Sequence, residues 1–438
     1  MKKGLILLSV LLLSVSLMAQ VRTGSIWGHV TDTQGAPLPG VSVTLLSPLM
    51  APLTSVTDVQ GIYRFPNLDP STHYNLTAEL QGFKKIEKTD IIVDVGKQSR
   101  IDITMEQGKL EEEVTVVATT PTIDAKSTAV GKNVTQDILQ ALPMSRDPWN
   151  VLIMTPAIEL DRENVGGSES GQQAGYYTKG DSSGGNNNIW AVDGVVVTDP
   201  AAIGSSPIYW DFDSFDEMNV TTGGADVTIQ TGAVALNMVT RRGGNRVSLG
   251  GRFYLTDSYF QASNLTSALE AQGVTNYNKI NQIKDYGFNL GGPVIKDKLW
   301  LWMSYGVQDI NALTIINTPQ KPVLYDYDFK IDIQPIAANR FEAMYIAGNK
   351  TFLGRSSSQS FPEGRNQSSP YHWGNPIIKL QDEQMIGNNL LLSAKFGYMN
   401  SSFQLIPGSD PNSVNLVHTD QTTGVTYDNW AYITTRPM

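Results

Sequence analysis

Apolar and polar residues alternate with a period of two along much of residues 246–438 of this 438-residue chain. Successive side chains of a β-strand point to opposite faces of the sheet, so such a segment has one apolar and one polar face. Strands of this kind suit a membrane barrel that is apolar outside and polar inside, and they also suit a soluble sandwich. The clearest apolar set is Tyr327, Phe329, Ile331 and Ile333, which interleaves with Asp328, Lys330, Asp332 and Gln334.

The N-terminus has the order of features that marks a secretory signal peptide. Lys2 and Lys3 precede an uncharged apolar run, Leu5–Leu17, and Ala19 is a small residue at a plausible cleavage point. A membrane span needs about 20 apolar residues, so this run is too short to cross a bilayer. We therefore expect residues 1–19 to be removed on export. No later stretch is apolar for long enough to form a membrane helix, so further membrane contact would be made by strands.

Residue content excludes several functional classes. The chain has no cysteine, which excludes a disulfide framework and a lipid anchor on cysteine. Its formal net charge is -10 and it has no basic cluster that could follow a phosphate backbone, so we expect no nucleic-acid partner. The 4 histidines have no zinc-ligand spacing, and no G-x-S-x-G motif is present. The sequence therefore predicts no enzyme, no metal site and no cofactor.

Residues 21–106 consist of short alternating apolar runs separated by turn residues. Strands with turn signals at intervals of roughly 8–12 residues predict a small antiparallel β-sandwich. The stretch GHVTDTQGAPLPGVSVTL at residues 28–45, with TDVQGIYRFPNL at residues 57–68, resembles the carboxypeptidase-regulatory-like domain family. The resemblance implies a fold similar to carbohydrate-binding sandwiches, which leaves weak glycan binding open because fold alone does not establish it.

An acidic hinge and a short β-prone segment occupy residues 107–119. Such a segment either pairs within its own fold as a linker strand or adds to the sheet of another protein. Its place between a sandwich and a glycine-rich domain resembles the TonB box of TonB-dependent receptors, which an inner-membrane energy-coupling protein binds by β-augmentation. The resemblance implies a contact strand of Glu113, Val114, Thr115, Val116, Val117 and Ala118.

Residues 120–245 combine helix, loop and strand signals. One helix is predicted after the N-cap residue Thr135, and a second over residues 147–154, where a proline stands in the first turn. The polar, glycine-rich stretch 166–188 predicts a loop. This region is therefore expected to mix α and β structure.

Two motifs of this region carry the strongest resemblance. The first is a hairpin with an Asp-Gly turn, and the second is a Gly-Gly turn followed by a buried strand, 233–240, that runs into a basic, glycine-rich exit. Together, and in this order, they resemble the plug domain of TonB-dependent receptors, and within that family the Oar-like receptors. The residues that carry the two motifs are Val192, Asp193, Gly194, Gly223, Gly224, Arg241, Arg242 and Gly243.

Two charged features beside these motifs are open to more than one interpretation. The acidic run 211–217 could suggest a Ca²⁺ loop, but it lacks the central glycine and the terminal glutamate of an EF-hand. A solvated turn with Phe212 and Phe215 packed inward is the favoured interpretation. The arginines at the exit of the buried strand, Arg241 and Arg242, are expected with Arg246 to contact the interior of a barrel or its carboxylates.

The length of the chain limits the barrel. A plugged transporter barrel has about 22 strands, whereas residues 246–438 provide about six to eight strands of membrane-spanning length. We therefore expect an N-terminal fragment. The predicted architecture is mainly β: a β-sandwich at 21–106, a hinge with the TonB box at 107–119, an α+β plug domain at 120–245, and the start of a transmembrane antiparallel β-barrel at 246–438.

The resemblance implies a function without covalent chemistry. An outer-membrane receptor of this kind, in contact with lipid and with its N-terminal domain in the periplasm, takes up a scarce or bulky solute by TonB-coupled active transport. The alternative is a non-transporting surface protein for adhesion or matrix assembly on the same architecture. The sequence does not indicate the solute or any substrate-binding residue.

Overall fold

The computed structural model describes most of the chain. The described residues are 23–48, 50–70, 73–94, 97–108, 113–117, 130–141, 146–156, 158–160, 171, 176–178, 187–199, 205–206, 209–224, 229, 231, 233–355, 364–368, 375–386, 390–407, 418–427 and 432–434. The predicted signal peptide, Ala118 of the predicted TonB box and most of the predicted loop at 166–188 lie outside these residues.

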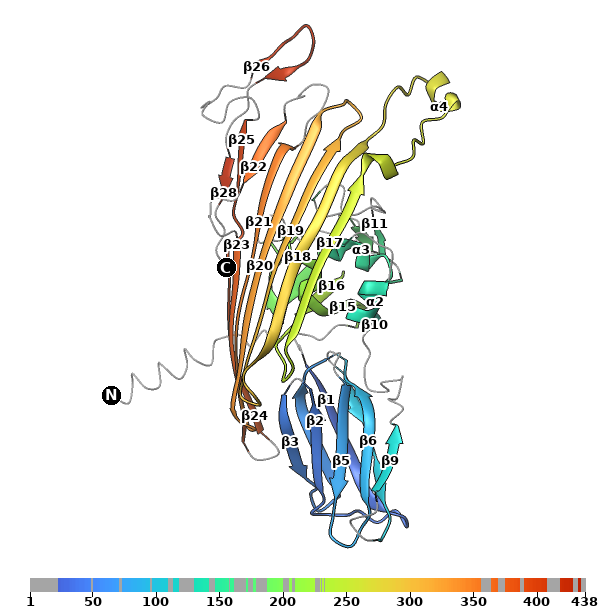
Figure 1. Cartoon of the computed structure of the whole chain (residues 1–438), viewed down its shortest axis with the longest axis vertical. Coiled ribbons are helices and arrows are strands. Elements are labelled where there is room, and N and C mark those ends of the chain that lie inside the picture. The colour runs from blue at the N-terminus through green and yellow to red at the C-terminus, as the bar shows by residue number, and fades with distance from the viewer. Residues whose placement is uncertain are drawn as a thin grey trace, which may run out of the picture.

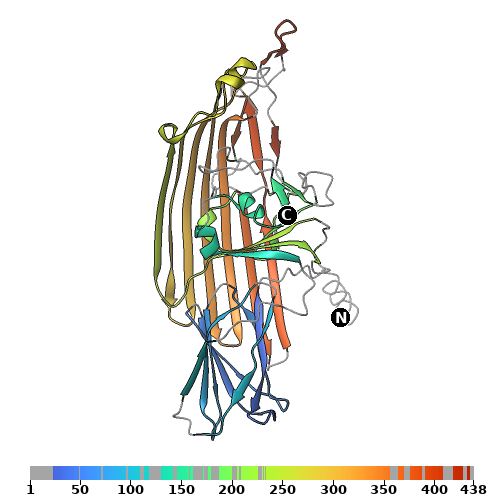
Figure 2. The ribbon, with the colours of Figure 1, turned by 90° about the vertical axis from the view of Figure 1, so that its right-hand side faces the viewer.

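The chain is mainly β and forms three bodies (Figure 1). A β-sandwich lies at one end, a tall curved sheet continues from it, and a small α+β plug rests against the concave face of that sheet (Figure 2). In the part of the chain that is described, no helix is long and apolar enough to cross a membrane.

The sandwich consists of two sheets. The first has the order β4 (Ile62–Leu68), β1 (Gly24–Asp32), β7 (Gln98–Arg100), with β8 (Ile103–Met105) also on β1, and the second has the order β3 (Met50–Val56), β2 (Ser42–Ser47), β5 (His73–Glu79), β6 (Lys85–Ile92), β9 (Glu113–Val117). Alternate residues of β1 are buried, as a period of two requires, and Ile26 and Val30 lie in the shared core. The predicted sandwich is confirmed, but three pairings are parallel rather than antiparallel: β1 with β7, β1 with β8, and β6 with β9.

The plug has a five-stranded sheet with short helices beside it. Its strand order is β10 (Val130–Thr135), β15 (Phe215–Gly223), β16 (Ala235–Thr240), β13 (Ile189–Val192), β14 (Val195–Val196), and its other elements are α2 (Gln136–Ala141), α3 (Pro148–Leu152), η1 (Phe212–Ser214), β11 (Ile158–Leu160) and β12 (Tyr176–Thr178). Both predicted helices are present within the described residues. The carboxylate of Asp147 caps α3 by accepting a hydrogen bond from the N–H of Asn150 at 2.9 Å.

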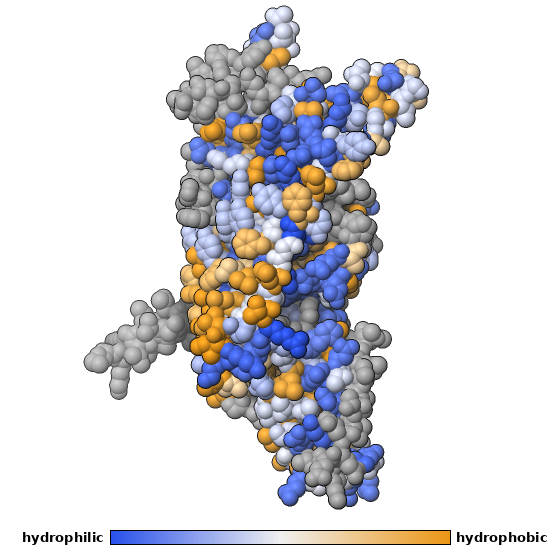
Figure 3. Space-filling view, in the orientation of Figure 1, coloured by the Kyte–Doolittle hydropathy of each residue, from blue (hydrophilic) through white to orange (hydrophobic). Residues whose placement is uncertain are grey.

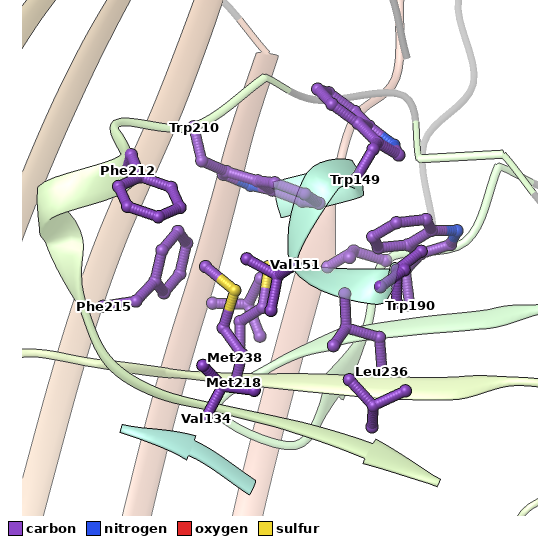
Figure 4. Packing of buried hydrophobic residues seen from close by; sticks show 14 of the residues in the cluster. Val134, Trp149, Val151, Trp190, Trp210, Phe212, Phe215, Met218, Leu236 and Met238 are labelled. Carbon is purple, nitrogen blue, oxygen red and sulfur yellow. The ribbon is translucent and has the colours of Figure 1, made fainter. Parts of the chain in front are cut away.

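One apolar core joins the plug to the curved sheet. Trp149, Trp190, Trp210 and Phe215 meet largely edge to face above the plug sheet (Figure 4). Side chains of the curved sheet belong to the same core. They are Met344, Ile346, Ile377 and Met399. The plug is therefore packed onto the sheet and is not a separate domain on a tether.

The curved sheet is antiparallel throughout. Its strands are β17 (Ser248–Asp257), β18 (Lys279–Ile295), β19 (Leu299–Leu313), β20 (Pro319–Ile336), β21 (Asn339–Arg355), β22 (Arg365–Ser368), β23 (Asn375–Ile386), β24 (Leu390–Met399), β25 (Phe403–Pro407) and β28 (Tyr432–Thr434). Segments β22 and β23 both pair with β21, on different parts of its length. The loops carry η2 (Ser258–Phe260), α4 (Ser267–Ala271) and a hairpin of β26 (His418–Thr419) and β27 (Thr426–Tyr427).

The period-two alternation has the predicted physical meaning. In β20 the side chains of Asp328, Lys330 and Asp332 are buried toward the plug, whereas Phe329 on the opposite face is 38% exposed. Figure 3 shows apolar side chains gathered on the outer face of the curved sheet near the sandwich. Large apolar residues on these strands that remain exposed include Leu249, Phe253, Phe288, Leu290, Leu380, Leu392 and Phe396.

Candidate coupling site

The predicted TonB box forms the edge strand β9 of the sandwich. Its backbone pairs in parallel with β6, from Glu113 opposite Lys85 to Val117 opposite Thr89. The segment thus pairs within its own fold, which was the first of its two interpretations. Among the described strands the order of the sheet ends at β9, and none of them pairs with the opposite edge of β9. A further strand could add at that edge.

The plug hairpin turns at two residues with left-handed backbone, Asp193 with φ 47° and Gly194 with φ 70°. The Asp193 side chain is fully buried. Its carboxylate accepts hydrogen bonds from the N–H of Thr240 at 3.0 Å and from the Thr240 hydroxyl at 2.6 Å. The same carboxylate also pairs with the curved sheet, since Lys330 Nζ lies 2.7 Å from Asp193 Oδ2. The hairpin turn therefore forms a buried ion pair with the curved sheet.

The exit of β16 contacts both other bodies. Arg242 Nη1 lies 2.5 Å from Oδ2 of Asp69, which belongs to the sandwich, and 3.7 Å from Oδ1 of Asp332, which belongs to β20. Gly243 follows, and a Cβ at this position would lie 2.2 Å from the carbonyl oxygen of Leu301 in β19. Arg241 instead pairs within the plug, at 3.4 Å from Asp216.

The other predicted turn, Gly223 and Gly224, lies at the end of β15. Gly224 has φ 59°, which is a left-handed conformation that suits glycine. Gly223 pairs with Val130 across the sheet, and a Cβ on Gly223 would meet no atom closer than 3.9 Å. Of the two residues, Gly224 is therefore the one whose backbone conformation requires glycine.

Eight buried ionic side chains converge where the sandwich, plug and curved sheet meet, and we call them the junction cluster. The sandwich provides Asp69, the plug provides Asp193 and Arg242, and the curved sheet provides Lys330, Asp332, Arg340, Glu342 and Lys379. Arg340 bridges Asp69 and Asp332 at 2.8 Å each, and Lys379 Nζ lies 2.7 Å from Glu342. None of the eight side chains is more than 14% exposed.

The junction cluster is electrically balanced, with four cations and four carboxylates. Burial of charge is unfavourable unless each charge is paired and hydrogen-bonded. Removal of one partner from a buried pair typically costs about 3–5 kcal/mol, because the other charge is left uncompensated. The three bodies are therefore held together by contacts that are hard to break singly.

A second buried ionic cluster joins the plug to β17–β20, farther from the sandwich. Arg146 of the plug lies 2.6 Å from Asp213 and 3.0 Å from Asp285, and Arg252 of β17 lies 2.7 Å from Asp211. Burial raises the pKa of Asp211, although Arg252 opposes the shift. Asp328 also accepts hydrogen bonds, from the hydroxyl groups of Ser304 and Ser214.

The prediction of a solvated turn at 211–217 was therefore partly wrong. Phe212 and Phe215 are packed inward as predicted, but the carboxylates of Asp211 and Asp213 contact Arg252 of the curved sheet, and the Asp211 side chain is fully buried. The reason is that Arg252, together with Arg146 of the plug, compensates these two carboxylates. Among the described residues, no group of three or more His, Asp or Glu side chains is arranged to hold a metal ion.

Sequence reasoning missed Asp69, Arg340, Glu342 and Lys379 as members of a site. Glu342 and Lys379 stand at inward positions of alternating strands, so the alternation itself could have identified them. Asp69 lies between β4 and β5 of the sandwich, and nothing in its local sequence indicates a partner 173 residues away.

Comparisons with known proteins identify a domain family and a relative of this chain. Residues 25–106 match the family model of the carboxypeptidase regulatory-like domain. The chain is 32% identical over 353 residues to the TonB-dependent transporter Oar of Myxococcus xanthus, a match that covers 76% of this chain and 32% of Oar. The chain thus spans about a third of the length of this curated relative.

Two receptors are among the solved structures that match part of this chain. The ferric enterobactin receptor PfeA of Pseudomonas aeruginosa has a TM-score of 0.49 and 14% identity, over 70% of this chain and 44% of PfeA. The siderophore receptor PirA of Acinetobacter baumannii also has a TM-score of 0.49 and 14% identity, over 70% of this chain and 43% of PirA.

Proposed function

We propose, from the 32% identity to Oar and the match of residues 25–106 to the carboxypeptidase regulatory-like domain, that the chain is an Oar-like TonB-dependent receptor, which serves in the outer membrane in the energised uptake of a solute. The solute binds at the external face, and force applied from the periplasm moves the plug. The apolar outer face of the curved sheet contacts lipid, and the sandwich lies in the periplasm. We assign no enzymatic activity to the chain.

The observation that carries this proposal is the way in which the plug is held. Its apolar core is shared with the inner face of the curved sheet, and the junction cluster adds buried ion pairs between the two. Thermal motion alone rarely separates such a contact, because separation exposes apolar surface and leaves charges unpaired. An energised transporter needs a plug of this kind, which remains closed until work is done on it.

The proposed contact for the energy-coupling protein is β9, with Ala118 following it. A strand of a TonB-type protein would add to the edge of β9 that faces away from β6, through main-chain hydrogen bonds. Glu113, Val114, Thr115, Val116 and Val117 are the residues whose backbone would take part. The motif residues of the plug would then act as its hinge and anchor, with Asp193 and Arg242 as the ionic anchors.

Binding of a TonB-type periplasmic domain to the purified receptor tests the proposal. Proline at position 116 has no N–H to donate, so Val116→Pro should weaken binding by about tenfold or more, equivalent to about 1.4 kcal/mol. Val116→Ala keeps the N–H and serves as the matched control, with binding close to that of the unmodified protein. Equal affinity of the proline variant and the control would contradict the assignment of β9.

A further inference from the structure

We propose that the sandwich is a lever, through which a pull on β9 reaches the plug by way of the contact between Asp69 and Arg242. This inference rests on the proposed uptake function and adds the route that the force takes. Pulling β9 could also act along the chain itself, because residues 118–129 connect β9 to β10. The two routes enter the plug at different strands.

The first step of the lever is the attachment of β9 to the sandwich. Five consecutive residues of β9 are in register with β6, from Glu113 to Val117. A partner strand that adds to the outer edge of β9 leaves this pairing intact. The pull is therefore delivered to the five-stranded sheet of the sandwich before it is delivered to the segment that follows β9.

The second step runs through the sandwich to Asp69. Strand β6 pairs with β5, where Ile91 is opposite Tyr74. Tyr74 is fully buried, and its hydroxyl group donates a hydrogen bond of 3.0 Å to the carbonyl oxygen of Asp69. The backbone of Asp69 is thereby fixed to the sheet that holds β9, and Asp69 is only 2% exposed.

The third step is the contact with the plug. Asp69 holds Arg242, and three residues further along the chain the N–H of Asn245 donates a hydrogen bond of 2.9 Å to the carbonyl oxygen of Pro48 in the sandwich. Both contacts fall on the short exit of β16. Both of these contacts between the sandwich and the plug therefore lie at the end of β16.

The position of β16 in the plug sheet makes this route effective. Strand β16 pairs with β15 on one side and with β13 on the other, whereas β10, where the covalent route enters, lies at the edge and pairs with β15. A displacement of β16 disturbs both halves of the sheet.

Labelling of a single cysteine in living cells tests the lever. The chain has no cysteine of its own, and Ser214 is 1% exposed with its hydroxyl group against Ser304 and Asp328 of the curved sheet. In a Ser214→Cys background, a membrane-impermeant maleimide reacts with the introduced cysteine only when the plug moves away from the curved sheet. The measured quantity is the ratio of the labelling rate in energised cells to that in cells treated with a protonophore.

We expect a ratio well above one in the Ser214→Cys background and a ratio near one when Asp69→Asn is added. Asp69→Glu, which keeps the charge, should restore part of the ratio. Asp102→Asn is the matched control, because Asp102 pairs with Arg100 inside the sandwich.

The outcomes separate the lever from the function on which it rests. If Asp69→Asn keeps the full ratio while Val116→Pro abolishes it, force travels along the chain and the lever is wrong. If the starting background shows a ratio of one, with no further effect of Val116→Pro, the energised function itself is wrong. If Asp69→Asn does not reach the outer membrane, Arg242→Gln removes the same contact from the plug side and is read in the same way.

Discussion

At the scale of single residues, the plug motifs owe their identities to distinct physical requirements. Asp193 combines a left-handed backbone, which aspartate tolerates better than most residues, with a buried carboxylate that compensates Lys330. Gly243 has room only for hydrogen beside the backbone of β19. Gly223, in contrast, has space for a methyl group. Residues that look equivalent as a motif are therefore expected to differ in their tolerance to substitution.

Replacement of Asp193 by alanine should destabilise the protein by about 3–5 kcal/mol, because Lys330 would remain buried without this carboxylate. Thermal unfolding of the purified protein in detergent measures the change. The matched control is Asp90→Ala in the sandwich, since Asp90 also has a positive φ of 63° but its ion pair with His73 is exposed. A similar cost for both substitutions would show that the backbone, and not the buried pair, accounts for the effect.

Gly243→Ala should loosen the plug from the curved sheet, with a cost of about 1–3 kcal/mol for an overpacked contact. Gly223→Ala should be close to neutral, because its Cβ would lie 3.9 Å from the nearest neighbour. Limited proteolysis of the plug in the folded receptor distinguishes the two variants. Equal protection of both variants would contradict the importance of the close approach at Leu301.

At the scale of secondary-structure elements, the sequence predicted the kinds of element better than their extents. The clearest alternation covered residues 327–334, whereas β20 runs over Pro319–Ile336, because proline and polar residues near its ends interrupt the apolar pattern without breaking the backbone ladder. The parallel pairing of β9 with β6 was not predictable, since a short β-prone segment carries no information on its partner. The hairpin at Asp193 was predictable because the Asp-Gly turn is local.

The element η1 should give the plug a pH dependence through Asp211. Burial raises the pKa of this carboxyl group, so the folded state binds its proton more tightly than the unfolded state does. The contribution of Asp211 to stability is therefore greatest at low pH and declines as the pH rises from the unfolded pKa of about 4 through the folded value. As the pH rises over this range, the Asp211→Asn variant should gain stability relative to the unmodified protein. Thermal unfolding at a series of pH values would measure this difference.

Asp102 of the sandwich provides a control of opposite sign for that series. Burial raises its pKa, but hydrogen bonds from the Arg100 side chain and the His29 N–H outweigh this effect and lower the pKa overall. Asp102 therefore stabilises the fold above its unfolded pKa, and this contribution is lost as the pH falls. Parallel profiles for Asp102→Asn and Asp211→Asn would contradict the assignment of opposite shifts.

At the scale of the whole molecule, contacts between bodies determine how much a residue contributes to stability. The sequence allowed each body to be predicted separately, because periodicity and turn residues are local properties. It could not show that Asp69 reaches Arg242 and Arg340, since such a contact depends on how the bodies dock. The site between the bodies was therefore the part least accessible to sequence reasoning.

The effect of Asp69→Asn on stability should accordingly depend on whether the plug and the curved sheet are present. In the whole receptor, the substitution removes a buried partner of two arginines and should cost about 3–5 kcal/mol. In a sandwich expressed as residues 20–118, the Asp69 side chain lacks its arginine partners from the other bodies. The substitution should then change the free energy of unfolding by no more than about 0.5 kcal/mol. Thermal unfolding of both proteins, each with and without the substitution, measures the difference.

The equal numbers of cations and carboxylates in the junction cluster also set its response to dissolved ions. In the closed state these groups neutralise one another out of reach of solvent, where salt screens little. Once the bodies part, both faces become wet and charged, and dissolved ions screen them. Salt should therefore leave the closed state almost unchanged and slow its re-formation, and under the proposed function the plug would stay open longer after each pull as the salt concentration rises.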